Sequence, residues 1–230
     1  MQMFKAAVAV AGLAVALSAP ALAAPLTGPF TVQYYQGNNP TAPSATDPTQ
    51  QALPSAVGAI QAVAGSFTSP SFTYNGPLAL TQTTNPPLIN AFFASAGGTT
   101  SIVLPATTMS TGGFKNETLI KFTFTTVGTI SGSITHDDGI SLFKAGDTTT
   151  NLLLPGASAP TSAVATFFAG LAQGTYDLYY TEANGAAAEL NFNVTNGNAT
   201  VIPEPVSMAL LGGGLLGLGL VRRMRRMRRA

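Results

Sequence analysis

The chain of 230 residues contains no cysteine and no tryptophan, and its single histidine is His136. Without cysteine it forms no disulfide, no thiolate metal site and no thiol nucleophile. A single histidine cannot hold zinc without several carboxylates, and no serine stands in the Gly-x-Ser-x-Gly pattern of many hydrolases. His136 ends an alternating segment, where a packed or hydrogen-bonded side chain is expected. A hydrolase would need a clustered acid and base, so we expect a protein that is not an enzyme.

Charged residues are also scarce, at 8% of the chain. Most basic residues lie at the two ends: Lys5 near the start and six arginines after residue 221. Between residues 24 and 202, three lysines stand against eight carboxylates, which leaves a net charge of −5. A domain of this charge is not expected to bind nucleic acid, and it is suited to a cation such as calcium.

The first 23 residues have the three-part order of a secretory signal peptide. Lys5 supplies a positive start, residues 6–17 are an unbroken apolar run, and Ala21-Leu22-Ala23 supplies small residues for a peptidase. We expect cleavage after Ala23, because cleavage one residue later would leave Pro25 at the new N-terminus. A buried alanine-rich helix is the alternative interpretation of this segment.

The C-terminal segment, residues 203–230, has a second three-part order. Pro203, Glu204 and Pro205 precede a 16-residue apolar stretch, residues 206–221. The stretch is followed by Arg222, Arg223, Arg225, Arg226, Arg228 and Arg229. As a helix it would be roughly 24 Å long, slightly short for a bilayer core of about 30 Å but workable with local thinning. We predict a transmembrane helix with a cytoplasmic arginine tail, which places the preceding domain outside the inner membrane.

Together these C-terminal features resemble the PEP-CTERM sorting signal. The resemblance implies a Gram-negative bacterium that makes exopolysaccharide. It also implies that an exosortase, a membrane transpeptidase-like enzyme, recognises the signal and removes the tail near Pro203, Glu204 and Pro205. The protein would then be membrane-anchored before processing, and afterwards located at the cell surface or outside the cell.

Period-two alternation dominates the region between the two ends. Ile120, Phe122 and Phe124 alternate with polar residues, and residues 176–180 and 188–194 do the same. This pattern predicts an antiparallel sheet with one wet face, and several such strands predict a mainly β domain, a β-sandwich or jelly roll over residues 24–195. Further expectations are strands at 30–35 and 72–80, a loop at 37–50, a short helix over 53–63, short apolar runs at 92–93, 102–104, 140–143 and 151–154, and a polar tether at 196–202.

Asp137 and Asp138 form the one cluster that indicates chemistry. They follow His136 and precede Gly139 at the end of an alternating segment. Adjacent carboxylates repel one another unless a cation or hydrogen-bond donors lie between them, and calcium commonly binds such pairs. The alternative is a structural turn, because Asp-Gly is a strong hairpin signal. From spacing alone both interpretations stay open.

Residues 121–190 resemble the protective-antigen-type lectin domain. The resemblance lies in Lys121-Phe-Thr-Phe, in residues 132–143 around Asp-Asp-Gly, and in residues 169–190. The last stretch carries the family's Tyr-x-Glu-x-x-Gly-x-Ala-x-Leu hairpin, here Tyr180, Glu182, Gly185, Ala187 or Ala188, and Leu190. The resemblance implies that Asp137 and Asp138 are calcium ligands, one through a cis peptide. The chain departs from the family in having no tryptophan to stack on a sugar and no Asp-Gly hairpin after Leu142.

Two functions remain open on these grounds. The first is a non-catalytic cell-surface or extracellular-matrix protein, sorted through its C-terminal signal and associated with exopolysaccharide. The second is a calcium-dependent carbohydrate-binding module that uses Asp137 and Asp138. They differ only in the role of these two carboxylates.

Overall fold

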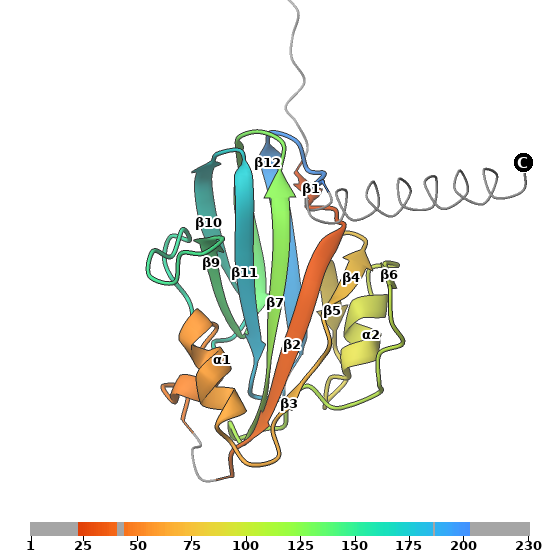
Figure 1. Ribbon diagram of the computed structural model, residues 1–230, viewed down its shortest axis with the longest axis vertical. Coiled ribbons are helices and arrows are strands. Elements are labelled where there is room, and N and C mark those ends of the chain that lie inside the picture. The colour runs from red at the N-terminus through yellow and green to blue at the C-terminus, as the bar shows by residue number, and fades with distance from the viewer. Residues whose placement is uncertain (1–22, 41–43, 186, 203–230) are drawn as a thin grey trace, which may run out of the picture.

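The computed structural model describes residues 23–40, 44–185 and 187–202, which form two antiparallel sheets packed face to face (Figure 1). The strands are β1 (Ala24–Pro25), β2 (Phe30–Asn38), β3 (Phe67–Thr68), β4 (Phe72–Asn75), β5 (Ala79–Gln82), β6 (Thr99–Thr100), β7 (Asn116–Thr126), β8 (Ile130–Asp137), β9 (Gly139–Lys144), β10 (Val164–Leu171), β11 (Gly174–Glu182) and β12 (Ala188–Asn196). The helices are η1 (Pro48–Gln50), α1 (Pro54–Gln61) and α2 (Ile89–Ala94). The expected mainly β, antiparallel fold is confirmed.

The two sheets differ in size. The seven-stranded sheet has the order β6-β4-β2-β7-β11-β9, with β3 also paired to β2. The five-stranded sheet has the order β1-β12-β8-β10, with β5 also paired to β12. From β7 onward, successive strands alternate between the two sheets, so the chain crosses to the other sheet after each of β7, β8, β9, β10 and β11.

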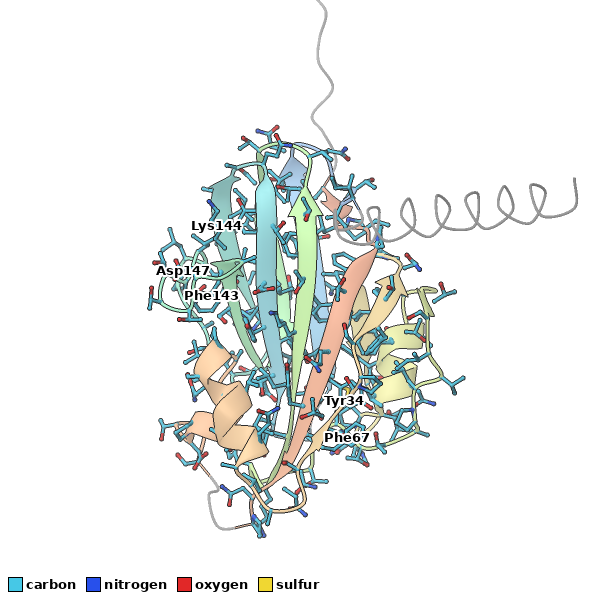
Figure 2. The ribbon with its side chains drawn as sticks, viewed as in Figure 1. Tyr34, Phe67, Phe143, Lys144 and Asp147 are labelled. Carbon is cyan, nitrogen blue, oxygen red and sulfur yellow. The ribbon has the colours of Figure 1, made fainter. Side chains whose placement is uncertain are left out.

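Inward-facing aromatic and aliphatic side chains fill the space between the sheets. Phe124 on β7 meets Phe192 on β12 edge to face, with ring centroids 5.7 Å apart, and Phe192 in turn contacts Phe168 on β10 at 4.7 Å. At one end of the larger sheet, buried Tyr34 contacts the half-exposed ring of Phe67 (Figure 2). The period-two alternation therefore marks a real buried face, which such aromatic contacts stabilise beyond the area that they bury.

Helix α1 covers part of the outer face of the larger sheet (Figure 1). Pro54 stands in its first turn, where its missing N–H is not needed. Ala56 and Ile60, one turn apart, are fully buried and form a second apolar cluster with Tyr35 and Tyr179 of the sheet. The helix expected from spacing over residues 53–63 is confirmed.

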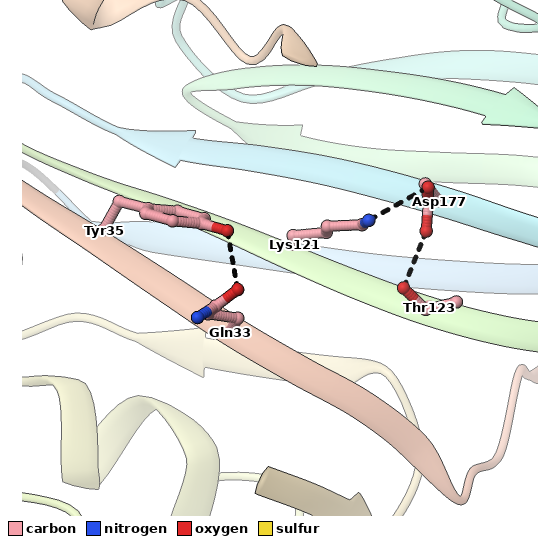
Figure 3. Close-up of polar contacts among 5 residues, drawn as sticks. All are labelled: Gln33, Tyr35, Lys121, Thr123 and Asp177. Atoms are coloured by element: carbon pink, nitrogen blue, oxygen red, sulfur yellow. Dashed lines mark hydrogen bonds and ion pairs between the residues drawn. The ribbon is translucent and has the colours of Figure 1, made fainter. Parts of the chain in front are cut away.

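Elsewhere the outer face of the larger sheet is polar (Figure 3). Lys121 on β7 pairs with Asp177 on β11 at 3.0 Å, and Thr123 donates a hydrogen bond to the same carboxylate at 2.6 Å. Tyr35 donates to Gln33 along β2 at 2.7 Å. The Lys121 and Asp177 side chains are only 29% and 10% exposed, so these contacts supply partners for polar groups that are partly removed from water.

The spacing of apolar residues did not predict the secondary structure of several short apolar runs. Residues 92–93 lie in α2, and neither 102–104 nor 151–154 forms a strand. The single strand expected over 72–80 is two strands, β4 and β5. Gly76 and Pro77 separate them, and the added side chain of any other residue at Gly76 would collide with the backbone of Gly98.

Residues 196–202, expected to be a polar tether, lie against the domain. Asn196 ends β12, and the Val201 amide donates to the Thr27 carbonyl at 3.0 Å. The Ile202 amide donates to the Thr125 carbonyl at 3.1 Å. Val201 is 2% exposed and belongs to the core. This one apolar side chain helps to hold the polar segment 196–202 against the sandwich.

Both terminal signals lie outside the described residues, namely residues 1–22 of the signal peptide and residues 203–230 with the predicted transmembrane helix. Among the helices that the structure describes, none combines the length and hydropathy that crossing a bilayer requires.

Glu117, at the start of β7, is a buried carboxyl that makes stability depend on pH. It is 1% exposed, and one carboxyl oxygen accepts a hydrogen bond from Gln50 at 2.8 Å. Within the described residues its other oxygen and the Gln50 side-chain oxygen have no partner. Burial raises the pKa of Glu117 to about 7. The folded state therefore holds this proton more tightly than the unfolded chain, whose glutamate titrates near 4.3.

We expect the contribution of Glu117 to the free energy of unfolding to fall by on the order of 3 kcal/mol as pH rises from about 4.5 to about 7, and to stay constant above that pH. The Glu117→Gln variant should lose that part of the slope and be more stable than the parent at pH 8. Urea unfolding at pH 4.5, 6 and 8 measures both quantities. Parallel pH profiles for the two proteins would mean that Glu117 is not the buried proton acceptor.

Candidate functional site

The candidate site lies at one end of the sandwich, where the chain crosses between the sheets after β8 and again after β11. Asp138 is the single residue between β8 and β9, and residues 183–187 connect β11 to β12. Thr181 pairs with Gly139, and Glu189 pairs with Asp137, so the two crossovers are neighbours. The alternative prediction of a hairpin turn at Asp138 and Gly139 is therefore wrong. The prediction of a hairpin between Tyr180 and Leu190 is wrong as well. In each case the flanking strands belong to opposite sheets.

Asp138 fastens these two crossovers together. One of its carboxylate oxygens accepts the backbone N–H of Ala183 at 2.8 Å and that of Asn184 at 3.2 Å. The residue is only 5% exposed, and its peptide bond to Asp137 is cis, as the resemblance implied. The carboxylate is thus held in one place by the second crossover.

A buried polar chain supports the same corner. Ser110 donates to one oxygen of Glu182 at 2.7 Å and itself accepts the N–H of Gly185 at 2.8 Å. The Tyr180 hydroxyl lies 3.1 Å from the other Glu182 oxygen and donates to the carbonyl of Asp137. Glu182 and Ser110 are fully buried. This chain joins the loop before β7 to both crossovers, which fixes the pocket-forming segments relative to one another.

These segments surround a pocket of about 320 Å³. It is lined by Phe114, Asp137, Asp138, Pro160, Thr161, Ser162 and Asn184. No lysine or arginine is among the residues that line it. Among the residues that the structure describes, none donates a hydrogen bond to the Asp137 carboxylate, whereas the Asp138 carboxylate has two donors. The site thus offers one fixed carboxylate and one carboxylate open to a ligand.

The electrostatics penalise negative charge in this pocket. Burial raises the pKa of Asp138 to about 6, with a further contribution from Asp137, although the N–H groups of Ala183 and Asn184 act in the opposite direction. Burial and the facing carboxylate of Glu189 also raise the pKa of Asp137. Like charges directly opposite one another on paired strands are destabilising. A bound cation would remove this penalty.

The donor set fits a hard cation. Calcium takes six to eight oxygen ligands from carboxylates, amide and carbonyl groups and water. Asp137, Asp138 and Asn184 bring such oxygens to one pocket, with the hydroxyls of Thr161 and Ser162 beside them. Within the described residues there is no group of three or more His, Asp or Glu side chains placed to hold a metal. Amide, hydroxyl or carbonyl oxygens, water or a ligand would therefore complete the coordination.

His136 takes the structural role expected from the sequence. It is fully buried, and its Nδ1 donates to the carbonyl of Asp138, which assigns the proton to that nitrogen. Burial lowers the pKa of His136, so the ring is neutral. The prediction of a packed, hydrogen-bonded histidine is confirmed.

The other pocket residues were not predictable as site residues from the sequence. Phe114 is half-buried and has φ of 56°, a left-handed conformation that is rare for an aromatic residue. Its neighbours Gly112 and Gly113 and the pair Asn184-Gly185 are turn signals, but neither shows that two loops so far apart in the sequence meet. Asn184 accepts the N–H of Gly113 at 3.3 Å, which links them.

No family model and no curated protein matches the chain. Two solved structures are similar to it, both described as PA14 domains, the protective-antigen type. The PA14 sugar-binding domain from an RTX adhesin is 13% identical with a TM-score of 0.46, covering 70% of this chain and 86% of that one. The PA14 domain of the MpAFP antifreeze protein is 14% identical with a TM-score of 0.41, covering 75% and 85%.

Proposed function

We propose that this protein is an exported, non-catalytic cell-surface or extracellular-matrix protein whose pocket binds calcium and, through the ion, the hydroxyl groups of a carbohydrate. One observation carries the proposal: the adjacent carboxylates of Asp137 and Asp138 line the same pocket, one held by two backbone donors and the other open. A fixed ligand sets the position of the ion, and a free one can close on it.

Calcium also accounts for the concentration of negative charge. Asp137 is followed in sequence by Asp138 and faces Glu189 on the paired strand β12. No basic side chain lines the pocket. Without a cation each carboxylate raises the pKa of a neighbour, which means that ionisation is costly. A divalent ion converts that repulsion into attraction.

The remaining pocket surface is suited to a neutral sugar. The volume of about 320 Å³ lies in the range of small-ligand sites. Phe114 and Pro160 offer apolar surface for the C–H face of a ring, while Thr161, Ser162 and Asn184 offer hydrogen-bonding groups. An open position on bound calcium would take sugar hydroxyls.

Export supplies the location in which such a site would act. The proposal retains the signal peptide at residues 1–23 and sorting by an exosortase at Pro203, Glu204 and Pro205. In its support, β1 begins at Ala24, the first residue after the proposed cleavage, and pairs there with Val194. Exopolysaccharide at the cell surface is then the proposed carbohydrate.

Calcium should stabilise the folded protein. At about 100 times its dissociation constant, calcium adds about 2.7 kcal/mol to the free energy of unfolding. The Asp137→Asn variant should fold normally, since the Asp137 carboxylate receives no hydrogen bond from the described residues, and should show no calcium response. Thermal melts in EDTA and in excess calcium measure the shift.

Asp147→Asn is the matched control, because it removes one negative charge in the loop after β9 (Figure 2), outside the pocket. Its calcium response should equal that of the parent protein. Equal melts of the parent in EDTA and in millimolar calcium would remove calcium binding and leave a matrix protein without this site. Binding to host exopolysaccharide that EDTA abolishes would establish the carbohydrate step.

A further inference from the structure

We propose that the end of the sandwich opposite the pocket rests on a lipid bilayer, so that the pocket faces away from the membrane. The proposal goes beyond calcium binding and rests on export and on the predicted membrane span. We call this end the uncharged end, defined by residues 24–29, 126–130, 169–174 and 196–202. Figure 1 shows the β7–β8 and β10–β11 turns together there, beside β1.

The composition of the uncharged end sets it apart. Its four segments contain no Asp, Glu, Lys or Arg. Apolar side chains are exposed on it, Val127 at 39% and Ile202 at 40%. Asp137, Asp138 and Glu189, by contrast, lie beside the pocket at the other end of the β8–β12 pair. Anionic lipid would repel that end and not the uncharged one.

The last described residues of the chain, Val201 and Ile202, are fastened at this same end. Ile202 is hydrogen-bonded to Thr125, and Val201 is hydrogen-bonded to Thr27. Only Pro203, Glu204 and Pro205 separate Ile202 from the start of the apolar stretch at Val206. Even fully extended, four Cα steps cover at most about 14 Å. If residues 206–221 enter the bilayer, the uncharged end must lie close to its surface.

The pocket is far from that surface. Strand β8 runs from Ile130 at the uncharged end to Asp137 at the pocket, eight residues. At about 3.3 Å per residue this is roughly 25 Å. The orientation would present the calcium site to material outside the cell, while residues 24 and 202, where the chain enters and leaves the domain, remain near the membrane.

The absence of cysteine makes the orientation measurable with single labels. Val127→Cys labels the uncharged end, Asn38→Cys the pocket end of β2, and Thr81→Cys an exposed position on β5. Each variant is made as residues 24–230, the chain expected after signal-peptide cleavage. It carries a fluorescent label and is reconstituted in phosphatidylethanolamine–phosphatidylglycerol vesicles that contain a lipid-bound quencher. Unchanged thermal melts establish that each labelled protein is folded.

We expect position 127 to lose most of its emission and positions 38 and 81 to lose little. Inserting a twenty-residue Gly-Ser linker between Ile202 and Pro203 should abolish the loss at 127. The proposal would be overturned by equal quenching at positions 127 and 38, or by strong quenching at position 81. It would also be overturned if the quenching at 127 persisted after the linker was inserted, or if the chain failed to float with vesicles. The calcium melts do not involve the span, so the two proposals fail separately.

Discussion

The Gly139→Ala variant is expected to lose about 3 kcal/mol of unfolding free energy, because the position has no room for a methyl group. A Cβ there would lie 2.3 Å from the carbonyl oxygen of Ser158 and 2.7 Å from the Thr181 methyl. The first neighbour is backbone, so relief requires β9 or the loop at Ser158 to move. Urea unfolding in EDTA measures the loss without a contribution from calcium.

Gly128→Ala is the control for this substitution. Gly128 lies in the turn between β7 and β8, with φ outside the left-handed region and no atom within 4 Å of the added methyl group. Alanine should be neutral there, or should stabilise the folded protein by up to about 1 kcal/mol because it lowers the conformational entropy of the unfolded chain. If both variants were equally stable, close packing of the first crossover would not explain the glycine of Asp-Asp-Gly.

The second large effect is expected at Asp138, where stability and calcium binding can be separated. Asp138→Ala leaves the backbone N–H groups of Ala183 and Asn184 without an acceptor and should cost about 2–4 kcal/mol in EDTA. Asp138→Asn keeps a carbonyl oxygen for these donors. It also removes a carboxylate whose burial raises its pKa to about 6, so most of the stability should remain.

Both Asp138 variants should nevertheless lose the calcium response, since each removes the fixed ionic ligand. Unfolding curves give the free energy of unfolding of the parent, Asp138→Ala and Asp138→Asn, each measured in EDTA and in calcium. Two results would contradict this account. One is an alanine variant as stable as the asparagine variant in EDTA, and the other is an asparagine variant that still responds fully to calcium.

The strands could be predicted from sequence because alternation is local. Ile120, Phe122 and Phe124 face the core in an order visible in eleven residues of β7. The sheet to which a strand belongs is not local. Asp-Gly marks a sharp change of direction whether the next strand pairs with the last or crosses to the other sheet. At the crossing, Asp138 is hydrogen-bonded to Ala183 and Asn184, which lie 45 and 46 residues away, so the neighbouring sequence does not reveal these contacts.

The residues of the candidate site likewise fall into those that the sequence alone predicts and those that only the fold reveals. Asp137 and Asp138 were visible because two adjacent carboxylates are unusual in a chain with few charges. Phe114 and Asn184 were not, because each stands in a glycine-containing loop typical of any turn. Only the fold brings these loops together. Likewise the composition of 196–202 indicates a linker, whereas the burial of Val201 attaches it to the core.

A crystal structure of residues 24–202 grown with calcium tests the central claim most directly. The account predicts an anomalous peak in the pocket, about 2.3–2.6 Å from a carboxylate oxygen of Asp137 and from one of Asp138. The Asp138 oxygen that accepts the Ala183 and Asn184 N–H groups should keep those bonds. A pocket that holds only water beside both carboxylates at saturating calcium would contradict the account.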